Sequence, residues 1–165
     1  MLATVMSTRI SRFLVVFLLA LAWRASAAVS DAELTRNVQK QISGLDYGMR
    51  RPVVTVADGV VTVSGTVGSL WLKQETINRA LKVTGVASVV SDLTIAKAEN
   101  DDKVAEGVVD RIQHYDLFTV FDDFQGRVKN GVVYLAGAVT EEKKHSDIIE
   151  RVSKVRGVQI GRAHV

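Results

Sequence analysis

Cysteine is absent from the chain. Its absence excludes disulfides, thiolate nucleophiles, cysteine-bound metals and lipid attachment through an N-terminal cysteine. Histidine is scarce as well, and the three histidines lack the H-x-H or H-x-x-x-H spacing of a metal site. No glycine-rich phosphate loop of the Walker or dinucleotide type occurs. We therefore predict neither a metal site nor a bound cofactor.

The N-terminal segment accounts for the basic composition. Arg9 and Arg12 precede an apolar run over residues 13–23, which is followed by Ala25-Ser26-Ala27. This pattern predicts a secretory signal peptide over residues 1–27, because the run is too short to span a bilayer; an uncleaved anchoring or amphipathic helix is the alternative. Without this segment, basic and acidic residues are equal in number, so the formal charge of +3 gives no support for nucleic-acid binding.

The remaining chain contains an internal repeat. Residues 58–67 (DGVVTVSGTV) recur as residues 130–139 (NGVVYLAGAV), seventy-two positions later. Upstream the offset is seventy, so that Asp31, Leu34, Val38 and Ile42 correspond to Asp101, Val104, Val108 and Ile112. The second copy therefore carries a two-residue insertion between these blocks. The repeat predicts two modules, over residues 28–97 and 98–159.

Each copy predicts the order helix, strand, strand, helix, strand. Apolar residues four apart follow Asp31 on one helical face, and residues 53–57 and 60–64 are β-branched runs. Asp58-Gly59 joins these runs, a pair that favours a type I′ turn, and Asn130-Gly131 corresponds to it. Ser69 and Thr140 are predicted to cap the second helix of their modules, and residues 86–95 form the final strand of the first.

The D/N-G-V-V-x-V/L-x-G-x-V hairpin, with a helix ending in Gly-Val and a final strand, resembles the BON family of bacterial envelope modules. That family is named after an osmotically inducible periplasmic protein and nodulation proteins. The resemblance implies an α+β fold of two tandem αββαβ modules, each with two helices on one face of a small mixed sheet. It also implies binding of phospholipid or another envelope component, and it does not imply an enzyme. Together with the signal peptide it predicts a periplasmic location in a Gram-negative bacterium, with the protein soluble or peripherally associated with the membrane.

Six glycines match the motif and are interpreted as turn and packing positions, because positive φ and close backbone approach both favour glycine. They are Gly59, Gly65, Gly85, Gly131, Gly137 and Gly157.

The second copy departs from the pattern after Gln159. Residues 160–165 read IGRAHV, which is the translation of a widely used sequencing adapter. We therefore predict that residues 160–165 are an artefact and that the second module, over residues 98–159, lacks its last strand.

Few residues are candidates for chemistry. His145-Ser146-Asp147 contains the residue types of a catalytic triad, but sequence neighbours on a helix point to different sides and cannot form a relay. Asp122 and Asp123 could contact a divalent cation; roles in a turn or in solvation are the alternative. We predict that the protein is not an enzyme.

A candidate lipid or partner surface comes from three segments. Leu70-Trp71-Leu72-Lys73 places three bulky apolar residues at a helix start, where they cannot all face one core. Trp71 beside Lys73 suits a headgroup interface, while filling a contact between the modules is its alternative. A positive edge before Pro52 and an aromatic cluster in the inserted loop complete the set. The candidate residues are Arg50, Arg51, Leu70, Trp71, Lys73, Tyr115 and Phe118, with Leu117 beside them.

The modules differ in charge. Residues 28–97 carry eight basic and six acidic side chains, whereas residues 98–159 carry nine and twelve. Opposite signs are compatible with docking of the modules but are too weak to establish it. The expected function is binding of phospholipid or another envelope component during envelope or osmotic stress. The alternative is a protein-interaction or chaperone-like module, so the expected partner is a membrane phospholipid or an envelope protein.

Overall fold

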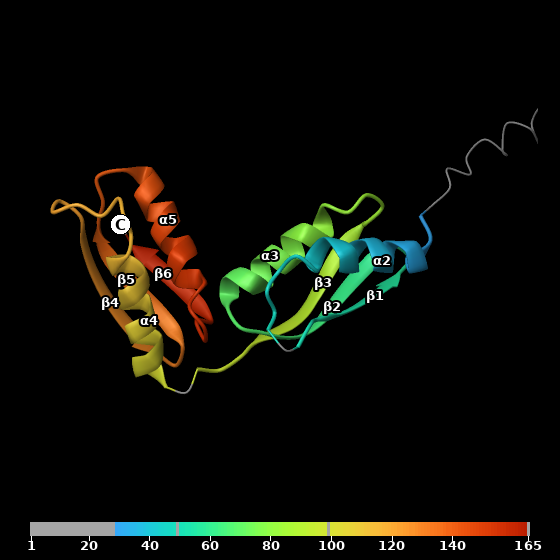
Figure 1. The fold of residues 1–165 in the computed structure, drawn as a ribbon, viewed down its shortest axis with the longest axis horizontal. Coiled ribbons are helices and arrows are strands. Elements are labelled where there is room, and N and C mark those ends of the chain that lie inside the picture. The colour runs from blue at the N-terminus through green and yellow to red at the C-terminus, as the bar shows by residue number, and fades with distance from the viewer. Residues whose placement is uncertain (1–28, 49, 99, 165) are drawn as a thin grey trace, which may run out of the picture. The chain divides into compact units, whose positions relative to one another are not determined.

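The computed structural model describes residues 29–48, 50–98 and 100–164, with side chains as far as Gln159. From Asp31 onward the chain forms two modules (Figure 1). The first module consists of α2 (Asp31–Ile42), β1 (Val53–Ala57), β2 (Val60–Val67), α3 (Leu70–Leu81) and β3 (Ser88–Ile95). The second consists of α4 (Asp101–Gln113), β4 (Asp123–Lys129), β5 (Val132–Ala138), α5 (Glu142–Ser153) and β6 (Ile160–His164).

Each module is built on a mixed three-stranded sheet. In the first, β1 pairs antiparallel with β2, and β2 pairs parallel with β3. The second repeats this topology with β4, β5 and β6. Parallel neighbours need a crossover connection, which α3 and α5 supply. The predicted α+β fold of two αββαβ modules with mixed sheets is confirmed.

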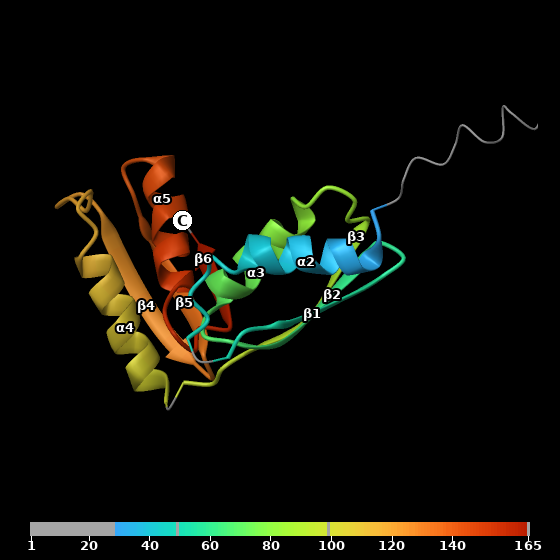
Figure 2. The same ribbon diagram turned by 45° about the vertical axis from the view of Figure 1, so that its right-hand side comes forward.

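A separate hydrophobic core lies in each module. Its two helices contact each other and the sheet, as Figures 1 and 2 show for α2 and α3. The helical stripe of Leu34, Val38 and Ile42 is buried as predicted, and Val61 and Val63 of β2 are fully buried. The core of the second module includes Val104, Val108, Val133, Ile148 and Val152.

The hairpin turns have the left-handed backbone that a type I′ turn requires. The φ angles are 51° and 75° at residues 58–59, and 54° and 76° at residues 130–131. In both modules a carboxylate from the first residue of the preceding helix accepts both N–H groups of the turn. Asp31 accepts them at 3.0 and 3.2 Å, and Asp101 at 2.7 and 2.9 Å. The helix start is thereby joined to the hairpin.

The other motif glycines serve two purposes. Gly65, Gly85 and Gly157 have φ angles of 134°, 95° and 87°. Gly137 is different, because a Cβ there would collide with the backbone carbonyl oxygen of Asp123 in the paired strand. Glycine therefore permits close strand approach at this position.

One of the two predicted helix caps is present. Ser69 caps α3 by accepting a hydrogen bond from a first-turn backbone N–H at 3.3 Å. The prediction that Thr140 caps α5 is wrong, because the N-cap residue is Glu141, whose side chain makes no capping bond. The Thr140 hydroxyl is bonded instead to Asp122 and Lys144.

The prediction that the second module lacks its last strand is also wrong. Residues 160–164 form β6, which pairs with β5 from Val132↔Ile160 to Ala136↔His164. Strand pairing uses backbone groups that every non-proline residue carries, so an atypical side-chain pattern does not prevent it. The origin of residues 160–165 and the module boundaries stay predictions.

The predicted signal peptide, residues 1–27, lies outside the described residues. Among the helices of the described part, none is both long enough and apolar enough to cross a membrane.

Candidate binding surfaces

Two exposed arginines precede the first strand. Arg50 and Arg51 are both exposed, and the nearby Val53 is 61% exposed. Within residues 29–48, 50–98 and 100–159, neither guanidinium takes part in an ion pair. These three residues form a small surface, the basic patch, that combines two free cations with an apolar side chain.

The start of α3 divides its bulky residues between the core and the surface. Leu72 is 6% exposed and belongs to the first core, whereas Leu70 and Trp71 are half-buried. The Lys73 ammonium donates a hydrogen bond to the carbonyl oxygen of Leu93 at 2.7 Å. The amine of Lys73 is thus hydrogen-bonded to strand β3.

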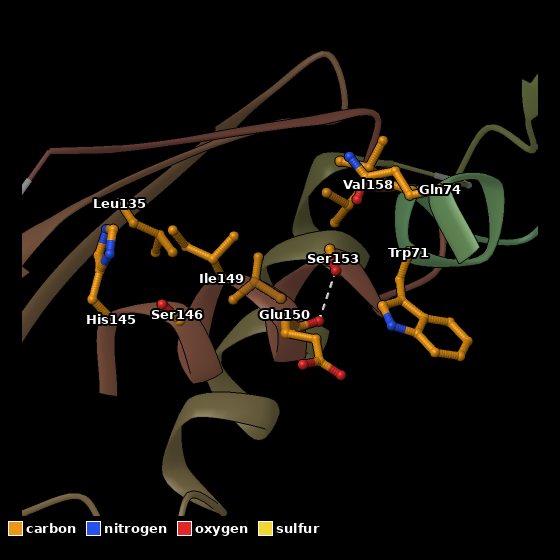
Figure 3. Close-up of a pocket in the computed structure, with 11 residues that line it drawn as sticks. Trp71, Gln74, Leu135, His145, Ser146, Ile149, Glu150, Ser153 and Val158 are labelled. Carbon is orange, nitrogen blue, oxygen red and sulfur yellow. Dashed lines mark hydrogen bonds between the residues drawn. The ribbon is translucent and has the colours of Figure 1, made fainter. Parts of the chain in front are cut away.

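Trp71 contacts α5 of the second module. The Nζ atom of Lys154 lies 4.9 Å from the centroid of the indole, within the range of a cation–π interaction. Trp71 and Gln74 also line a pocket of about 400 Å³, together with Ile149 and His145 of α5 (Figure 3). The indole is therefore engaged by protein on one side, as in the alternative of an inter-module contact. Its role at a membrane stays a prediction.

Tyr115 does not belong to the candidate surface, and this expectation is wrong. Its side chain is 5% exposed, its hydroxyl donates to Asp147 Oδ2 at 2.9 Å, and Arg151 Cζ lies 4.8 Å from its ring centroid. Burial, with the hydrogen bond to Asp147, raises the pKa of Tyr115. Hydrogen bonds from Lys143 and then from Tyr115 lower the pKa of Asp147.

The rest of the inserted loop is exposed and apolar. The exposed fractions are 51% for Leu117, 41% for Phe118, 93% for Val120 and 79% for Phe121. We call residues 117–121 the apolar loop. Only Phe118 among them has an aromatic neighbour in the described chain, Phe124 of β4, with ring centroids 6.0 Å apart.

A buried ion pair holds the apolar loop to α5. Lys144 Nζ donates to Asp122 Oδ2 at 2.9 Å, and both side chains are almost fully buried. The same carboxylate accepts bonds from the backbone N–H and hydroxyl of Thr119, and from those of Thr140. The Lys144 ammonium, followed by backbone and hydroxyl donors, holds the pKa of Asp122 well below its ordinary value. This network connects Thr119 of the loop, through Asp122, to Thr140 and α5.

The side chains of the candidate catalytic and cation-binding residues contact different partners and do not form one site. Asp122 is occupied by Lys144, whereas Asp123 is exposed at the start of β4. His145 Nδ1 lies 3.8 Å from Glu142 Oε1, and Asp147 is bonded to Lys143 and Tyr115. Nowhere in the described chain do three or more histidine or acidic side chains form a cluster that could hold a metal.

Sequence reasoning missed a groove between α4 and β4. It has a volume of about 240 Å³, and its lining includes Val109, Ile112, Phe118, Phe124, Gly126 and Leu135. A signal was present, because Gly126 corresponds in the repeat to Val54, a buried residue of the first core. The side chain that fills this position in one module is missing in the other.

The comparison with protein families assigns the first module. Residues 30–97 match the family model of the BON domain. The first module is a BON domain. The second module repeats the strand order and hairpin of this BON domain, with an inserted loop. Membership of the family indicates that this module is associated with the bacterial envelope. A comparison with curated proteins finds no match.

Solved structures give a weaker likeness. One is the C-terminal domain of CdsD, a structural protein of the type III secretion system of Chlamydia trachomatis, with 10% identity and a TM-score of 0.33. That match covers 83% of this chain and all of the other. A second CdsD structure has 11% identity and a TM-score of 0.34, and the match covers 83% of this chain and 63% of the other. Likeness at this level supports no conclusion about function.

Proposed function

We propose that this is a non-enzymatic periplasmic protein whose paired modules bind phospholipid or another envelope component and protect the envelope under osmotic or other stress. The observation that carries the lipid assignment is the basic patch of the BON domain. Arg50 and Arg51 are exposed and make no ion pair in the described chain, and Val53 is exposed beside them.

The physical chemistry of the basic patch suits an anionic headgroup. A guanidinium can donate two parallel hydrogen bonds to phosphate oxygens, and an apolar neighbour can enter the headgroup layer. Each basic residue near an anionic leaflet contributes about 1 kcal/mol. Two arginines alone therefore give weak and reversible membrane association.

Vesicle cosedimentation tests the lipid assignment. The protein should sediment with vesicles of phosphatidylglycerol and phosphatidylethanolamine, and less with vesicles of phosphatidylcholine. Replacing both Arg50 and Arg51 with alanine should remove about 2 kcal/mol, a roughly thirtyfold weaker partitioning. Lys40→Ala, which removes an exposed cation of α2, is the matched control.

Salt and composition complete the test. Raising the salt from about 0.1 M to about 1 M shortens the screening length from about 10 Å to about 3 Å, so binding to the anionic vesicles should fall. Folded protein that ignores vesicles of every composition would contradict the lipid assignment.

The second candidate function is a protein-interaction or chaperone-like module. The apolar loop favours it, because Val120 and Phe121 expose 93% and 79% of their surface without forming part of either core. Large exposed apolar patches commonly mark interaction sites.

A further inference from the structure

The groove of the second module is bounded by α4 and by the edge strand β4, which lie side by side in Figures 1 and 2. Its lining is mostly apolar, with Gln113 and Arg127 as the polar residues, and its volume of about 240 Å³ lies below the range typical of sites for whole small molecules. Apolar cavities of roughly 150 Å³ already bind benzene-sized groups. The groove therefore suits a single bulky apolar side chain.

Comparison of the repeats shows that the fold does not require this groove. Gly126 stands where the BON domain has the buried Val54, and Val109 stands where it has the exposed glutamine Gln39. A Cβ at Gly126 would lie 3.4 Å from Leu135 Cδ2, so the site accepts a side chain without a severe clash. Both differences make the second module more apolar at its surface and emptier beneath it.

Hydrogen bonds hold the apolar loop at the mouth of the groove. Phe118 lines the groove, and its backbone N–H donates to the carbonyl oxygen of Tyr115 at 2.9 Å. The backbone N–H of Thr119 donates to Asp122 Oδ2 at 2.8 Å, and that of Asp122 donates to the carbonyl oxygen of Thr119 at 3.0 Å. Asp122 is in turn held by the buried Lys144. Preorganisation of this kind reduces the entropy lost on association.

The free charges beside the loop are carboxylates. Asp116 and Asp123 flank it and are exposed, and Glu141 follows Thr140, which is bonded to Asp122. None of these three carboxylates forms an ion pair in the described chain. We call Asp116, Asp123 and Glu141 the acidic rim.

The two lysines near the loop are already paired with carboxylates. Lys144 is paired with Asp122, Lys143 with Asp147, and Arg127, at the groove, lies over the ring of Tyr134 at 5.0 Å. The acidic rim therefore disfavours anionic headgroups and is complementary to a basic partner.

The strand β4 supplies a second contact for a polypeptide. It is an edge strand, so one row of its backbone N–H and C=O groups is not used by β5. Phe124, Gly126 and Val128 of β4 all line the groove. A segment paired with this edge would direct alternate side chains toward the groove, the arrangement in which strand addition combines affinity with specificity.

We propose that the second module binds an extended polypeptide segment of a partner protein, with a bulky apolar side chain in the groove and basic residues at the acidic rim. The proposal rests on the second candidate function and not on lipid binding. It assigns the two modules different partners, a headgroup for the basic patch and a polypeptide for the groove.

Nuclear magnetic resonance of the ¹⁵N-labelled protein tests the proposal. The ligand is a synthetic nonapeptide with a central leucine between valines and with lysines toward both ends. Its addition should shift the amide signals of Val109, Phe118 and Gly126. Replacing the lysines with glutamates should weaken binding by up to about fivefold. Replacing the leucine with serine should weaken it by about tenfold or more, because one buried apolar side chain is lost.

Two variants carry residues of the BON domain into the groove. Gly126→Val fills it, and Val109→Gln makes its edge polar; each should weaken binding of the lysine peptide, Gly126→Val by about tenfold or more. Lys40→Ala should bind normally. The proposal is overturned if saturating peptide leaves the three amides unshifted, or if folded Gly126→Val binds like the wild type.

A membrane role for the same surface is a separate outcome. If the peptide is inert while Val109→Gln and Gly126→Val abolish vesicle sedimentation, the groove serves lipid and the proposal is wrong. Loss of vesicle binding in the variant lacking Arg50 and Arg51, with peptide binding intact, supports the division of roles. Failure of all vesicle binding contradicts only the lipid assignment.

Discussion

The two modules bury different residues at the same place in α3 and α5. In the BON domain the residue is Leu72, which is 6% exposed, and in the second module the matched residue is Lys144, which is 3% exposed. The lysine is tolerated because Asp122 enters the interior to pair with it. The common fold therefore needs this position filled but does not need it to be apolar.

Two other differences create the groove without changing the fold. Val54 and Gln39 in the BON domain become Gly126 and Val109 in the second module. A core residue is lost while an exposed residue becomes apolar, which is the reverse of what stability alone favours. Such departures from the repeat identify positions where binding, rather than folding, explains the residue.

The largest expected effect tests what the modules share. Leu34→Ala should lower the free energy of unfolding by about 2–5 kcal/mol, because Leu34 is 1% exposed and its loss leaves a cavity. Val104→Ala, at the matched position, should cost less because fewer carbon atoms are removed. Urea unfolding followed by circular dichroism measures both, with the exposed Lys40→Ala as control. Equal stability of Leu34→Ala and Lys40→Ala would show that the helical stripe is not core.

The next prediction tests the difference between Leu72 in the BON domain and the Lys144–Asp122 ion pair in the second module. Lys144→Leu restores the residue type of the BON domain but leaves Asp122 without its cation, so the second module should be destabilised. The loss should stay below that of Leu34→Ala, because opening of the apolar loop lets water reach Asp122. Asp122→Asn combined with Lys144→Leu should recover much of the stability. If the double variant recovers no stability, the destabilisation comes from the loop and not from the unpaired charge of Asp122.

The Lys144–Asp122 ion pair of the second module should also make the free energy of unfolding depend on pH in the acid range. The pKa of Asp122 is lowered from its ordinary value of 3.8 by Lys144 and by further hydrogen bonds. Its stabilising contribution is therefore present above that value and is lost as the pH falls below it, since the unfolded chain then binds about one more proton. Asp147 acts in the same direction, so Asp122→Asn should flatten the acid dependence without abolishing it. An unchanged pH profile would contradict this account.

Periodicity and the repeat predicted the fold well because those signals are local. The stripe over residues 34–42 and the turn at residues 58–59 needed only near neighbours in sequence. Burial of Lys144 was not predictable from its helix, since its partner Asp122 lies twenty-two residues away. Tyr115 was misplaced for the same reason, because its hydroxyl is bonded to Asp147, thirty-two residues away.

The other outcomes have different physical causes. The strand β6 was missed because its pairing depends on backbone groups and not on an alternating pattern. Alignment of Gly126 with Val54 would have indicated the groove. A glycine in a strand has two explanations, however: close packing that leaves no room for a side chain, or an open site.

A smaller effect should be alike in both modules. Asp31→Ala and Asp101→Ala each remove a carboxylate that accepts two turn N–H groups, which should cost about 1–2 kcal/mol. Hydrogen exchange at the amides of residues 58–59 or 130–131 should accelerate in the affected module only. Asp102→Ala removes an exposed first-turn carboxylate without a turn contact, so its effect should be a few tenths of a kcal/mol. Similar costs for Asp101→Ala and Asp102→Ala would mean that the link to the turn adds nothing.

The smallest effect on stability is the sharpest test of the comparison. Val109 is 50% exposed, and glutamine already occupies the matched position of the BON domain, so Val109→Gln should change the free energy of unfolding by less than about 0.5 kcal/mol. Binding of the lysine peptide should nevertheless weaken, because Val109 lines the groove. A side chain that matters for binding but not for folding belongs to the surface that distinguishes the modules. If Val109→Gln destabilises the protein strongly, the valine is a folding residue, and the difference between the repeats reflects packing instead of recognition.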